Sequence, residues 1–284
     1  MSFKFCGFAD EAGKTLAEQI KVTQELGWPG LELRLLEGKN FCDLDDQTFY
    51  AAYDTLVASG IKVVGFGSQI ANWSRPITTD FQKDVDELKR NIPRMNKVGT
   101  KLIRIMSYPN DKDNPWPEAE WKREVFRRLY KLARIAQDGG VVLAHENCNG
   151  YGGLGPKQAL EMLAEVNSPA LKLIIDTGNT TLHDNDNEAT WRYYSQTVEH
   201  TIHVHVKAGK PGAGGEWVTC YPDEDPVQAR IFADLKKRGY DGWISIEPHL
   251  AAAVHAGKDV SDAAEAASIY VEYGRRLVKL CQEL

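Results

Sequence analysis

The sequence predicts an α/β protein that folds as a single (β/α)8 TIM barrel over residues 1–284. Eight short apolar runs rich in β-branched and aromatic residues indicate strands, and amphipathic stretches of helical period lie between them. Successive runs begin roughly 25 to 40 residues apart, which suits a repeated βα unit in which each helix crosses back to a parallel strand. No linker or low-complexity segment divides the chain, so one domain is expected.

The eight predicted strands follow one another along the whole chain. They cover residues 3–9, 29–35, 61–67, 101–107, 140–146, 171–176, 201–207 and 242–247. Glycines between a helical stretch and the next strand, such as Gly60 and Gly99, are typical of helix C-caps. An open doubly wound sheet is the alternative, but no Gly-x-Gly-x-x-Gly follows the first strand and no Walker sequence occurs.

The composition is that of an ordinary globular protein with a mildly acidic balance. Lys and Arg number 34 against 40 Asp and Glu, which gives a net charge of −6 and disfavours binding to nucleic acid phosphates. No apolar run reaches the roughly 18 residues of a membrane span, and the N-terminus does not resemble a signal peptide. We therefore expect a cytoplasmic protein without membrane partners, and a homo-oligomer is compatible with this composition. Five scattered cysteines without a Cys-x-x-Cys pair predict neither a disulfide framework nor a thiolate zinc site.

Ionisable side chains stand at the carboxyl ends of four consecutive predicted strands, where the active sites of such barrels lie. They are Glu146, Asp176, His205 and Glu247. Three carboxylates that converge repel one another unless a cation lies between them, and an added imidazole completes an O₃N donor set. Such a set suits Mn²⁺, Co²⁺, Mg²⁺ or Zn²⁺, and the imidazole favours Mn²⁺. Taken singly, each carboxylate could instead cap a helix or pair with a lysine.

Neighbouring residues on the same strands extend this candidate site. His203 and His205 share a face because side chains alternate along a strand, and His205 is the preferred ligand since it lies nearer the mouth. Lys207, on the same face, could hold a substrate oxygen or pair with a glutamate. His145 directly precedes Glu146 and is a candidate general base, although strict alternation points it out of the barrel, where it would pack as a structural histidine.

Several loop residues on the same side of the barrel are further candidates. Tyr151 and Trp217 predict an aromatic wall for a sugar ring or an aglycone, with ordinary loop packing as the alternative. The glycine-rich segment 209–225 indicates a flexible lid, or less favourably a phosphate site. Asp10 and Glu11 either face the mouth or cap the next helix. His249 is a candidate acid, with a surface role as the alternative.

The sequence resembles the xylose-isomerase-like TIM-barrel family, also called the sugar phosphate isomerase/epimerase family. The resemblance covers nearly the whole chain and is carried by Gly-Leu-Glu-Leu-Arg at 30–34, Glu-Asn-Cys at 146–148, Asp-Thr-Gly-Asn at 176–179, His-Val-Lys at 205–207 and Ile-Ser-Ile-Glu at 244–247. Its ketose 3-epimerases imply that Glu146, Asp176, His205 and Glu247 bind one divalent metal. They also imply that the two glutamates act as base and acid in proton transfer through a metal-bound enediolate.

Two positions depart from the pattern of those epimerases. Asn179 stands where they carry a histidine three residues after the metal aspartate, and Pro211 stands where they carry an arginine six residues after the metal histidine. Both family residues contact the sugar, so the resemblance implies the metal site more specifically than the substrate. The surroundings of His145 also resemble relatives that cleave 3-keto-glycosides, including C-glycosides.

The sequence therefore predicts a divalent-metal-dependent sugar isomerase or epimerase acting on a small sugar or keto-sugar. Glu146, Glu247 and His145 are the expected catalytic residues. The expected substrate contacts are Lys207, Asn179, Trp217 and Tyr151. A lyase or dehydratase that eliminates a β-substituent from a keto-sugar or 3-keto-glycoside is the alternative. A non-catalytic carbohydrate-binding barrel is a remote third, which the complete set of ligand residues disfavours.

Overall fold

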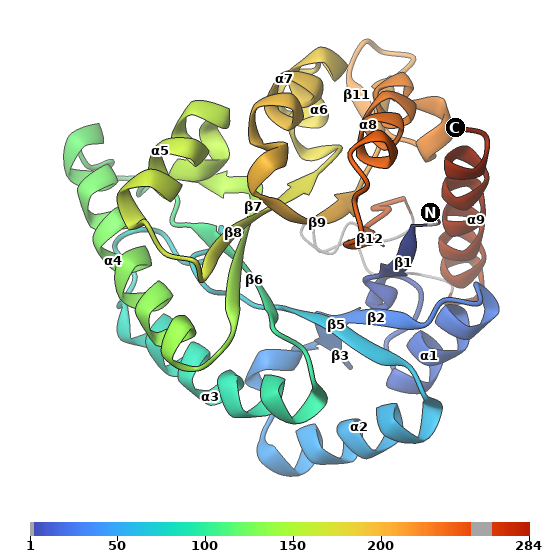
Figure 1. Cartoon of the computed structure of the whole chain (residues 1–284), viewed down its shortest axis with the longest axis horizontal. Coiled ribbons are helices and arrows are strands. Elements are labelled where there is room, and N and C mark those ends of the chain that lie inside the picture. Colours follow the sequence, from blue (N-terminus) through green and yellow to red (C-terminus); the bar gives the residue numbers. More distant parts are fainter. Residues whose placement is uncertain (1–2, 251–262) are drawn as a thin grey trace.

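Eight parallel strands form a barrel surrounded by helices in the computed structural model, as predicted (Figure 1). The model describes residues 3–250 and 263–284. The strands lie in the order β1-β12-β9-β8-β7-β6-β5-β2 around the barrel. Their bounds are β1 Lys4–Gly7, β2 Gly30–Leu33, β5 Lys62–Gly67, β6 Leu102–Ser107, β7 Val142–Gly150, β8 Leu171–Asp176, β9 Thr201–Val206 and β12 Trp243–Ile246. All eight predicted strands are present.

The barrel closes between its first two strands. Phe8, just after β1, forms an isolated parallel bridge with Glu32 of β2. The other neighbouring strands of the sheet pair through several residues each, for example β9 with β12 from His203 to Val206. The closure between β1 and β2 is therefore a thin seam, and it lies toward the carboxyl ends of both strands, since Phe8 follows β1 directly and Glu32 is the third residue of β2.

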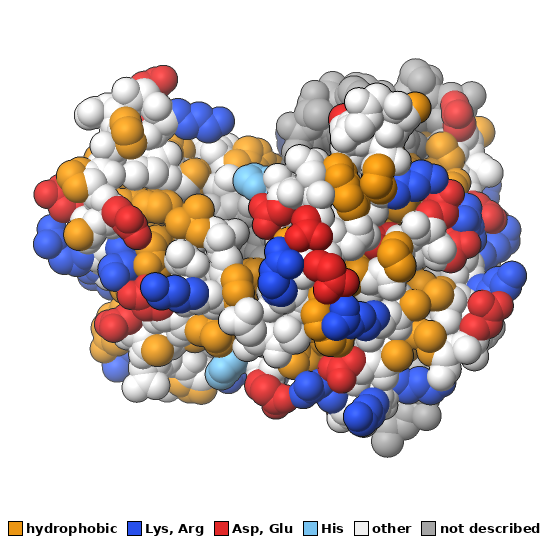
Figure 2. All heavy atoms as spheres, turned by 90° about the horizontal axis from the view of Figure 1, so that it is seen from above, with side chains coloured by type: hydrophobic (Ala, Val, Ile, Leu, Met, Phe, Trp, Pro, Cys, Tyr) orange, Lys and Arg blue, Asp and Glu red, His pale blue; other side chains and the backbone are white. Residues whose placement is uncertain are grey.

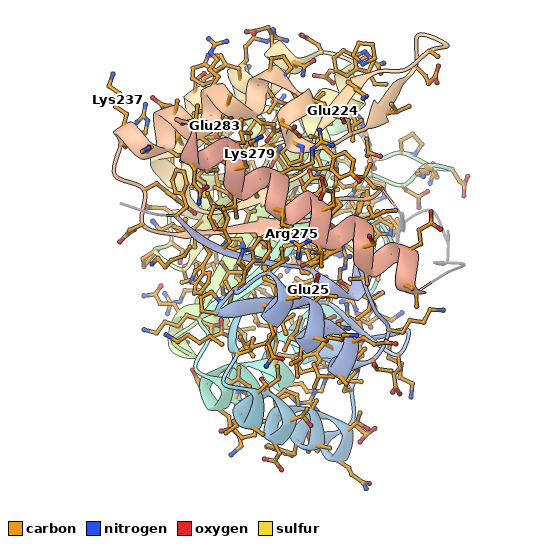
Figure 3. All side chains as sticks on the ribbon, turned by 90° about the vertical axis from the view of Figure 1, so that its right-hand side faces the viewer. Glu25, Glu224, Lys237, Arg275, Lys279 and Glu283 are labelled. Carbon is orange, nitrogen blue, oxygen red and sulfur yellow. The ribbon has the colours of Figure 1, made fainter. Side chains whose placement is uncertain are left out.

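Helices occupy the intervals between the strands and cover the outside of the barrel. They are α1 Leu16–Glu25, α2 Asp46–Ser59, α3 Gln82–Val98, α4 Glu118–Asp138, α5 Pro156–Val166, α6 Asn179–Asp184, α7 Asn187–Thr197, α8 Pro226–Lys237 and α9 Ala263–Gln282. Figure 3 shows the last helix, α9, lying against α1, with Arg275 beside Glu25 in an ion pair of 3.1 Å. No helix of the described part combines the length and apolarity that a bilayer crossing requires.

Side chains alternate between the two faces of each strand, and this alternation separates the core from the site. Leu173 and Ile175 of β8 are buried in the hydrophobic layer between the sheet and the helices. Asp176 ends the same strand on the opposite face, inside the barrel, and is fully buried. The outer face is thus apolar and holds the fold together, whereas the inner face near the strand ends is polar.

Two antiparallel hairpins project beyond the barrel strands. One joins β3 (Leu35–Leu36) to β4 (Lys39–Asn40), and the other joins β10 (Gly209–Pro211) to β11 (Trp217–Thr219). The second hairpin lies in the segment that the sequence indicates as a flexible lid. Asp225 anchors its base by accepting a hydrogen bond of 3.2 Å from the amide of Gly209. The glycines in this segment therefore serve a hairpin rather than an irregular loop.

Gly150→Ala is expected to destabilise the fold because the end of β7 passes very close to β6. Gly150 has φ +79°, and an added Cβ would lie 2.3 Å from the carbonyl carbon of Ser107. We expect a loss of about 2 kcal/mol or more in the free energy of unfolding, measured by urea denaturation. Gly38→Ala is the matched control, since Gly38 has φ +80° with no atom within 4 Å of its added Cβ. Equal losses in both variants would contradict a clash at Gly150.

Candidate active site

The structure brings the four predicted metal ligands together at the carboxyl ends of consecutive strands. Glu146 comes from β7, Asp176 from β8, His205 from β9, and Glu247 follows β12 directly. One ligand atom from each residue lies within 4.8 Å of those of the other three, and all four residues are at most 1% exposed. Parallel register explains the convergence, because Asp176 pairs with His205 and the amide of Glu247 donates to the carbonyl of Val206.

Two ligand atoms of this cluster are buried and make no hydrogen bond. Asp176 accepts hydrogen bonds at Oδ1 from the amides of Gly178 (2.8 Å) and Asn179 (2.6 Å), whereas its Oδ2 accepts none and has only the ion pair with Lys207 Nζ at 3.4 Å. His205 Nδ1 also makes no hydrogen bond, and it lies 3.7 Å from Glu146 Oε1 and 4.0 Å from Glu247 Oε2. Buried polar atoms normally have partners, so these atoms and the O₃N donor set fit a divalent cation.

A buried glutamate lies behind the ligand histidine. Glu32 Oε2 lies 3.1 Å from His205 Nε2 and 3.1 Å from His203 Nε2, so one carboxylate joins both imidazoles. Burial disfavours the protonated imidazole, but the carboxylates of Glu32 and Glu146 outweigh it and raise the pKa of His205 to about 10. This arrangement directs Nε2 of His205 to Glu32 and leaves Nδ1 facing the other three ligands.

Three cations balance the carboxylates from the surrounding strands. Arg34 of the β2 end contacts Glu247, Arg104 of β6 lies 3.2 Å from Glu146 Oε2, and Lys207 lies 3.4 Å from Asp176 Oδ2. Burial alone would raise the pKa of Glu146, but Arg104 and His205 hold it at about 2. The pKa of Asp176 is raised, because burial and the carboxylates of Glu146 and Glu247 outweigh Lys207.

Two of the predicted substrate residues lie against the cluster. Asn179 begins α6 and donates from Nδ2 to Glu146 Oε1 at 3.0 Å. Lys207, which is 3% exposed, donates from Nζ to Asn179 Oδ1 at 2.9 Å and lies 3.6 Å from Glu247 Oε2. Both side chains therefore lie beside the carboxylates, at a place where they can orient oxygen atoms of a bound substrate.

The structure does not bring His145 or Tyr151 to the cluster. His145 points out of the barrel, where its Nε2 lies 2.9 Å from Ser107 Oγ and its ring packs against Gly152. The Tyr151 hydroxyl donates to Glu161 of α5 at 2.6 Å, and its ring packs edge-on against Trp121 of α4. Strand alternation and the turn after β7 thus place both side chains in the helical layer. They do not occupy the positions expected of a general base and an aromatic cleft wall.

The remaining loop residues divide between the mouth and its rim. Trp217 is half-buried in the β10–β11 hairpin. Asp10 and Glu11 do not cap α1, because Thr15 forms its own capping box with Glu18. Both acidic residues instead bind Arg34, Asp10 Oδ2 at 2.8 Å and Glu11 Oε1 at 3.2 Å. Asp10 and Glu11 thus extend the charged network at the mouth.

Other site residues were not singled out from the sequence. Arg34, Arg104 and Glu32 are each at most 3% exposed and lie inside the barrel. The signal for them is a charged residue within a short apolar strand, as in Leu-Glu-Leu-Arg and Leu-Ile-Arg-Ile. His249 Nε2 lies 3.2 Å from Glu247 Oε1, so this candidate acid is at the mouth rather than on an open surface.

Glu32→Gln is expected to weaken metal binding about 10- to 100-fold without unfolding the barrel. The amide keeps the size of the side chain but loses the negative charge that lies 3.1 Å from Nε2 of His205. The dissociation constant for Co²⁺, followed by its visible absorption, measures the effect. Glu87→Gln is a matched control, because Glu87 is equally buried but pairs with Arg75. Unchanged Co²⁺ affinity in Glu32→Gln would remove Glu32 from this role.

The fold and the clustered acidic and histidine side chains define a TIM barrel of the kind that carries its site at the carboxyl ends of its strands. A profile of the xylose isomerase-like TIM barrel matches residues 20–269 of the chain. The chain therefore belongs to the xylose isomerase-like TIM barrel family, as its sequence motifs predicted. It is also 28% identical over 152 residues to an uncharacterized protein of Methanocaldococcus jannaschii, and this match spans 52% of the chain and 47% of that relative.

Solved structures share the whole fold at low sequence identity. A xylose isomerase-like TIM barrel protein from Mycobacterium smegmatis in complex with magnesium aligns with a TM-score of 0.70 at 13% identity, over 99% of this chain and 98% of the other. D-allulose 3-epimerase from Methylomonas sp., in complex with D-allulose, aligns with a TM-score of 0.67 at 19% identity, over 97% of this chain and 99% of the other. The probable 3-DHS dehydratase from Bacillus anthracis aligns with a TM-score of 0.67 at 17% identity, over 95% of this chain and 98% of the other. These likenesses concern the fold.

Proposed function

We propose that the protein is a divalent-metal-dependent isomerase or epimerase of a sugar or keto-sugar, which moves a proton at the carbon beside a carbonyl. The chain belongs to the xylose isomerase-like family, and solved structures of similar fold include sugar epimerases, one of them in complex with D-allulose. Glu146, Asp176, His205 and Glu247 would hold the metal, and Mn²⁺ is the ion that their donor set favours. When bound, the metal would polarise the substrate carbonyl and so acidify the adjacent carbon.

The observation that carries this proposal is the placement of the two glutamates. In the barrel, β8 and β9 lie between β7 and β12, so Asp176 and His205 separate Glu146 from Glu247. The cluster thus has one carboxylate on each side, and each has its own cation, Arg104 for Glu146 and Arg34 for Glu247. Two separately held carboxylates can serve as base and acid on a carbon bound between them.

Other side chains of this chain would bind and orient the substrate. Asn179 lies beside Glu146 and Lys207 Nζ beside Glu247, and both can donate hydrogen bonds to substrate hydroxyl groups. Phe8 packs its ring edge-on against His205, with a centroid distance of 5.1 Å, and so supports the ligand imidazole from inside the barrel.

Proton NMR in D₂O tests the proposal directly. The Mg²⁺-loaded protein is incubated with a panel of ketoses, inososes and 3-keto-glycosides, and the proton beside each carbonyl is followed. We expect deuterium to replace that proton in at least one compound, with a new isomer and no released group. Absence of exchange with every member of the panel would contradict an isomerase of this substrate class.

A lyase or dehydratase is the second candidate, and the position of His249 favours it. The His249 imidazole stands at the mouth with its Nε2 3.4 Å from Glu11 Oε1, in addition to its contact with Glu247. Burial and the nearby Lys207 lower the pKa of His249 to about 4, so its imidazole is neutral near pH 7. It would protonate a leaving group only after taking up the proton removed in the first step. In the same NMR experiment, deuterium exchange accompanied by a released aglycone or by dehydration would establish this alternative.

A further inference from the structure

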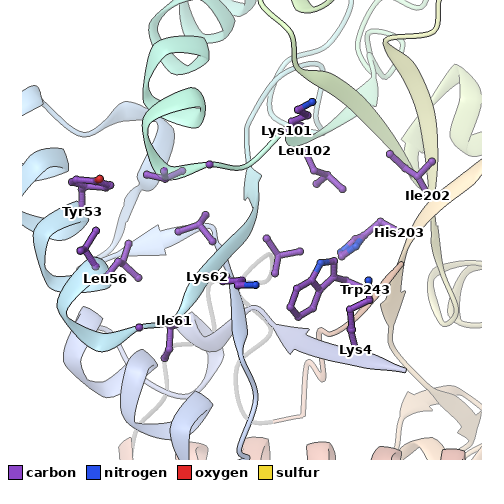
Figure 4. Close-up of a pocket in the computed structure, with 16 residues that line it drawn as sticks. Lys4, Tyr53, Leu56, Ile61, Lys62, Lys101, Leu102, Ile202, His203 and Trp243 are labelled. Atoms are coloured by element: carbon purple, nitrogen blue, oxygen red, sulfur yellow. The ribbon is translucent and has the colours of Figure 1, made fainter. Parts of the chain in front are cut away.

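A hollow opens at the opposite end of the barrel from the candidate active site. It has a volume of about 830 Å³ and is lined by the amino-terminal ends of strands, including Lys62 of β5, Leu102 of β6 and Trp243 of β12 (Figure 4). Its rim exposes two large apolar side chains, Val57 (61% exposed) and Ile202 (37% exposed). A hollow of this size and apolar lining is within the range of small-molecule sites.

The charged residues of this basal hollow are all basic. Lys4, Lys62 and Lys101 line it, and none of the described residues that line it is an aspartate or glutamate. All three lysines are exposed, and within residues 3–250 and 263–284 none of them forms an ion pair. On the face drawn in Figure 2, by contrast, Lys and Arg side chains are interspersed with Asp and Glu. The hollow is therefore a local positive site in a chain of net charge −6.

The inner end of the basal hollow is lined by an aromatic ring, that of Trp243, and by a buried polar side chain, that of His203. Lys4 Nζ stands 6.0 Å from the centre of the Trp243 ring, so the cation and the flat ring face the same space. His203, which is 1% exposed, lines the inner end and connects through Glu32 to the ligand His205. Figure 4 shows His203 beside Trp243 at this end.

We propose that the basal hollow binds a small organic anion, namely an apolar, preferably aromatic body that carries a carboxylate or phosphate group. The apolar body packs on Trp243, Leu102 and the neighbouring valines, and the three lysines surround the anionic group. This site is separate from the candidate metal centre, and its occupancy does not depend on the reaction proposed above.

Isothermal titration calorimetry with three matched probes tests this site on the full-length protein. The probes are 2-naphthoate, 2-naphthyl phosphate and the neutral 2-naphthylmethanol, which share one aromatic body. We expect saturable one-to-one binding of at least one anion, with the alcohol at least about tenfold weaker. The two anions distinguish a carboxylate from a phosphate ligand. Lack of saturable binding by both anions, or equal affinity for the alcohol, would overturn the proposal.

Lysine variants then locate the bound anion. The double substitution Lys62→Gln and Lys101→Gln is expected to weaken binding about tenfold, because it removes two of the three charges. Lys172→Gln is the matched control, since Lys172 also lies near the amino-terminal end of a strand, β8, but does not line the hollow. Unchanged affinity in the double variant, or the same loss in Lys172→Gln, would place the anion elsewhere and overturn the proposal.

Discussion

Glu247→Gln is expected to lower the rate of proton exchange at the substrate carbon about 100-fold or more while metal remains bound. The amide retains an oxygen that can act as a ligand, but it cannot accept a proton in the pH range of the assay. Arg34 keeps its ion pairs with Asp10 and Glu11, so the substitution leaves that cation partnered and the barrel folded. The measurement combines turnover in D₂O with metal analysis of the purified variant.

Glu161→Gln is the control for this substitution. Glu161 lies on α5 and pairs with Lys122 and Tyr151, neither of which belongs to the four-residue cluster of candidate metal ligands. We expect exchange at the rate of the unmodified protein in Glu161→Gln. If Glu247→Gln keeps its metal and its substrate affinity and loses less than about tenfold in rate, Glu247 is a ligand but not a proton-transfer group.

His205→Ala is expected to abolish stoichiometric metal binding with the fold retained. The substitution removes the one nitrogen donor of the O₃N set and leaves three carboxylates that repel one another. Glu32 remains 3.1 Å from His203 Nε2, so the carboxylate behind the site keeps a partner. We expect the dissociation constant for Co²⁺ to rise more than about 100-fold, with an unchanged circular dichroism spectrum.

The matched control for His205→Ala is His200→Ala. His200 is exposed and lies just before β9, so its loss tests whether any histidine of this segment contributes to metal binding. We expect no change in Co²⁺ affinity for His200→Ala. Full metal occupancy in His205→Ala would show that His205 is not a ligand and would leave only oxygen donors for the cation.

The barrel could be predicted from the sequence because its strands are short apolar runs of nearly constant spacing. The run at 171–176 matches β8 in both bounds, and 201–207 differs from β9 by one residue. The sequence did not indicate the β10–β11 hairpin, since each strand has only three residues, too few to show the alternation that marks a strand, and β10 contains a glycine and a proline. Such hairpins depend on tertiary anchors, here the Asp225 side chain.

The part of the candidate site that could be predicted from the sequence is the part formed by residues at the strand ends. The four ligand positions could be placed together because parallel strands bring their carboxyl ends to one mouth. The charges inside the barrel were harder to predict, since Arg34 and Arg104 belong to a residue type that is rarely buried, although each stands in or next to a short apolar strand. Their positions depend on contacts between strands. Arg34 at the end of β2 reaches Glu247 after β12, and Arg104 of β6 reaches Glu146 of the neighbouring strand β7.

The thin seam between β1 and β2 is the place where the sheet of the barrel can open locally at the lowest cost. Among residues 3–250 and 263–284, the backbone pairing between these two strands is the Phe8–Glu32 bridge, and Arg34 spans the same gap through its ion pairs with Asp10 and Glu247. Local opening is favoured where few backbone bonds must break. Any opening along this line would part Glu32 from His205 and Arg34 from Glu247 together. The same few residues, Glu32 and Arg34 above all, therefore hold the barrel closed at this seam and keep the side chains of the candidate site in place.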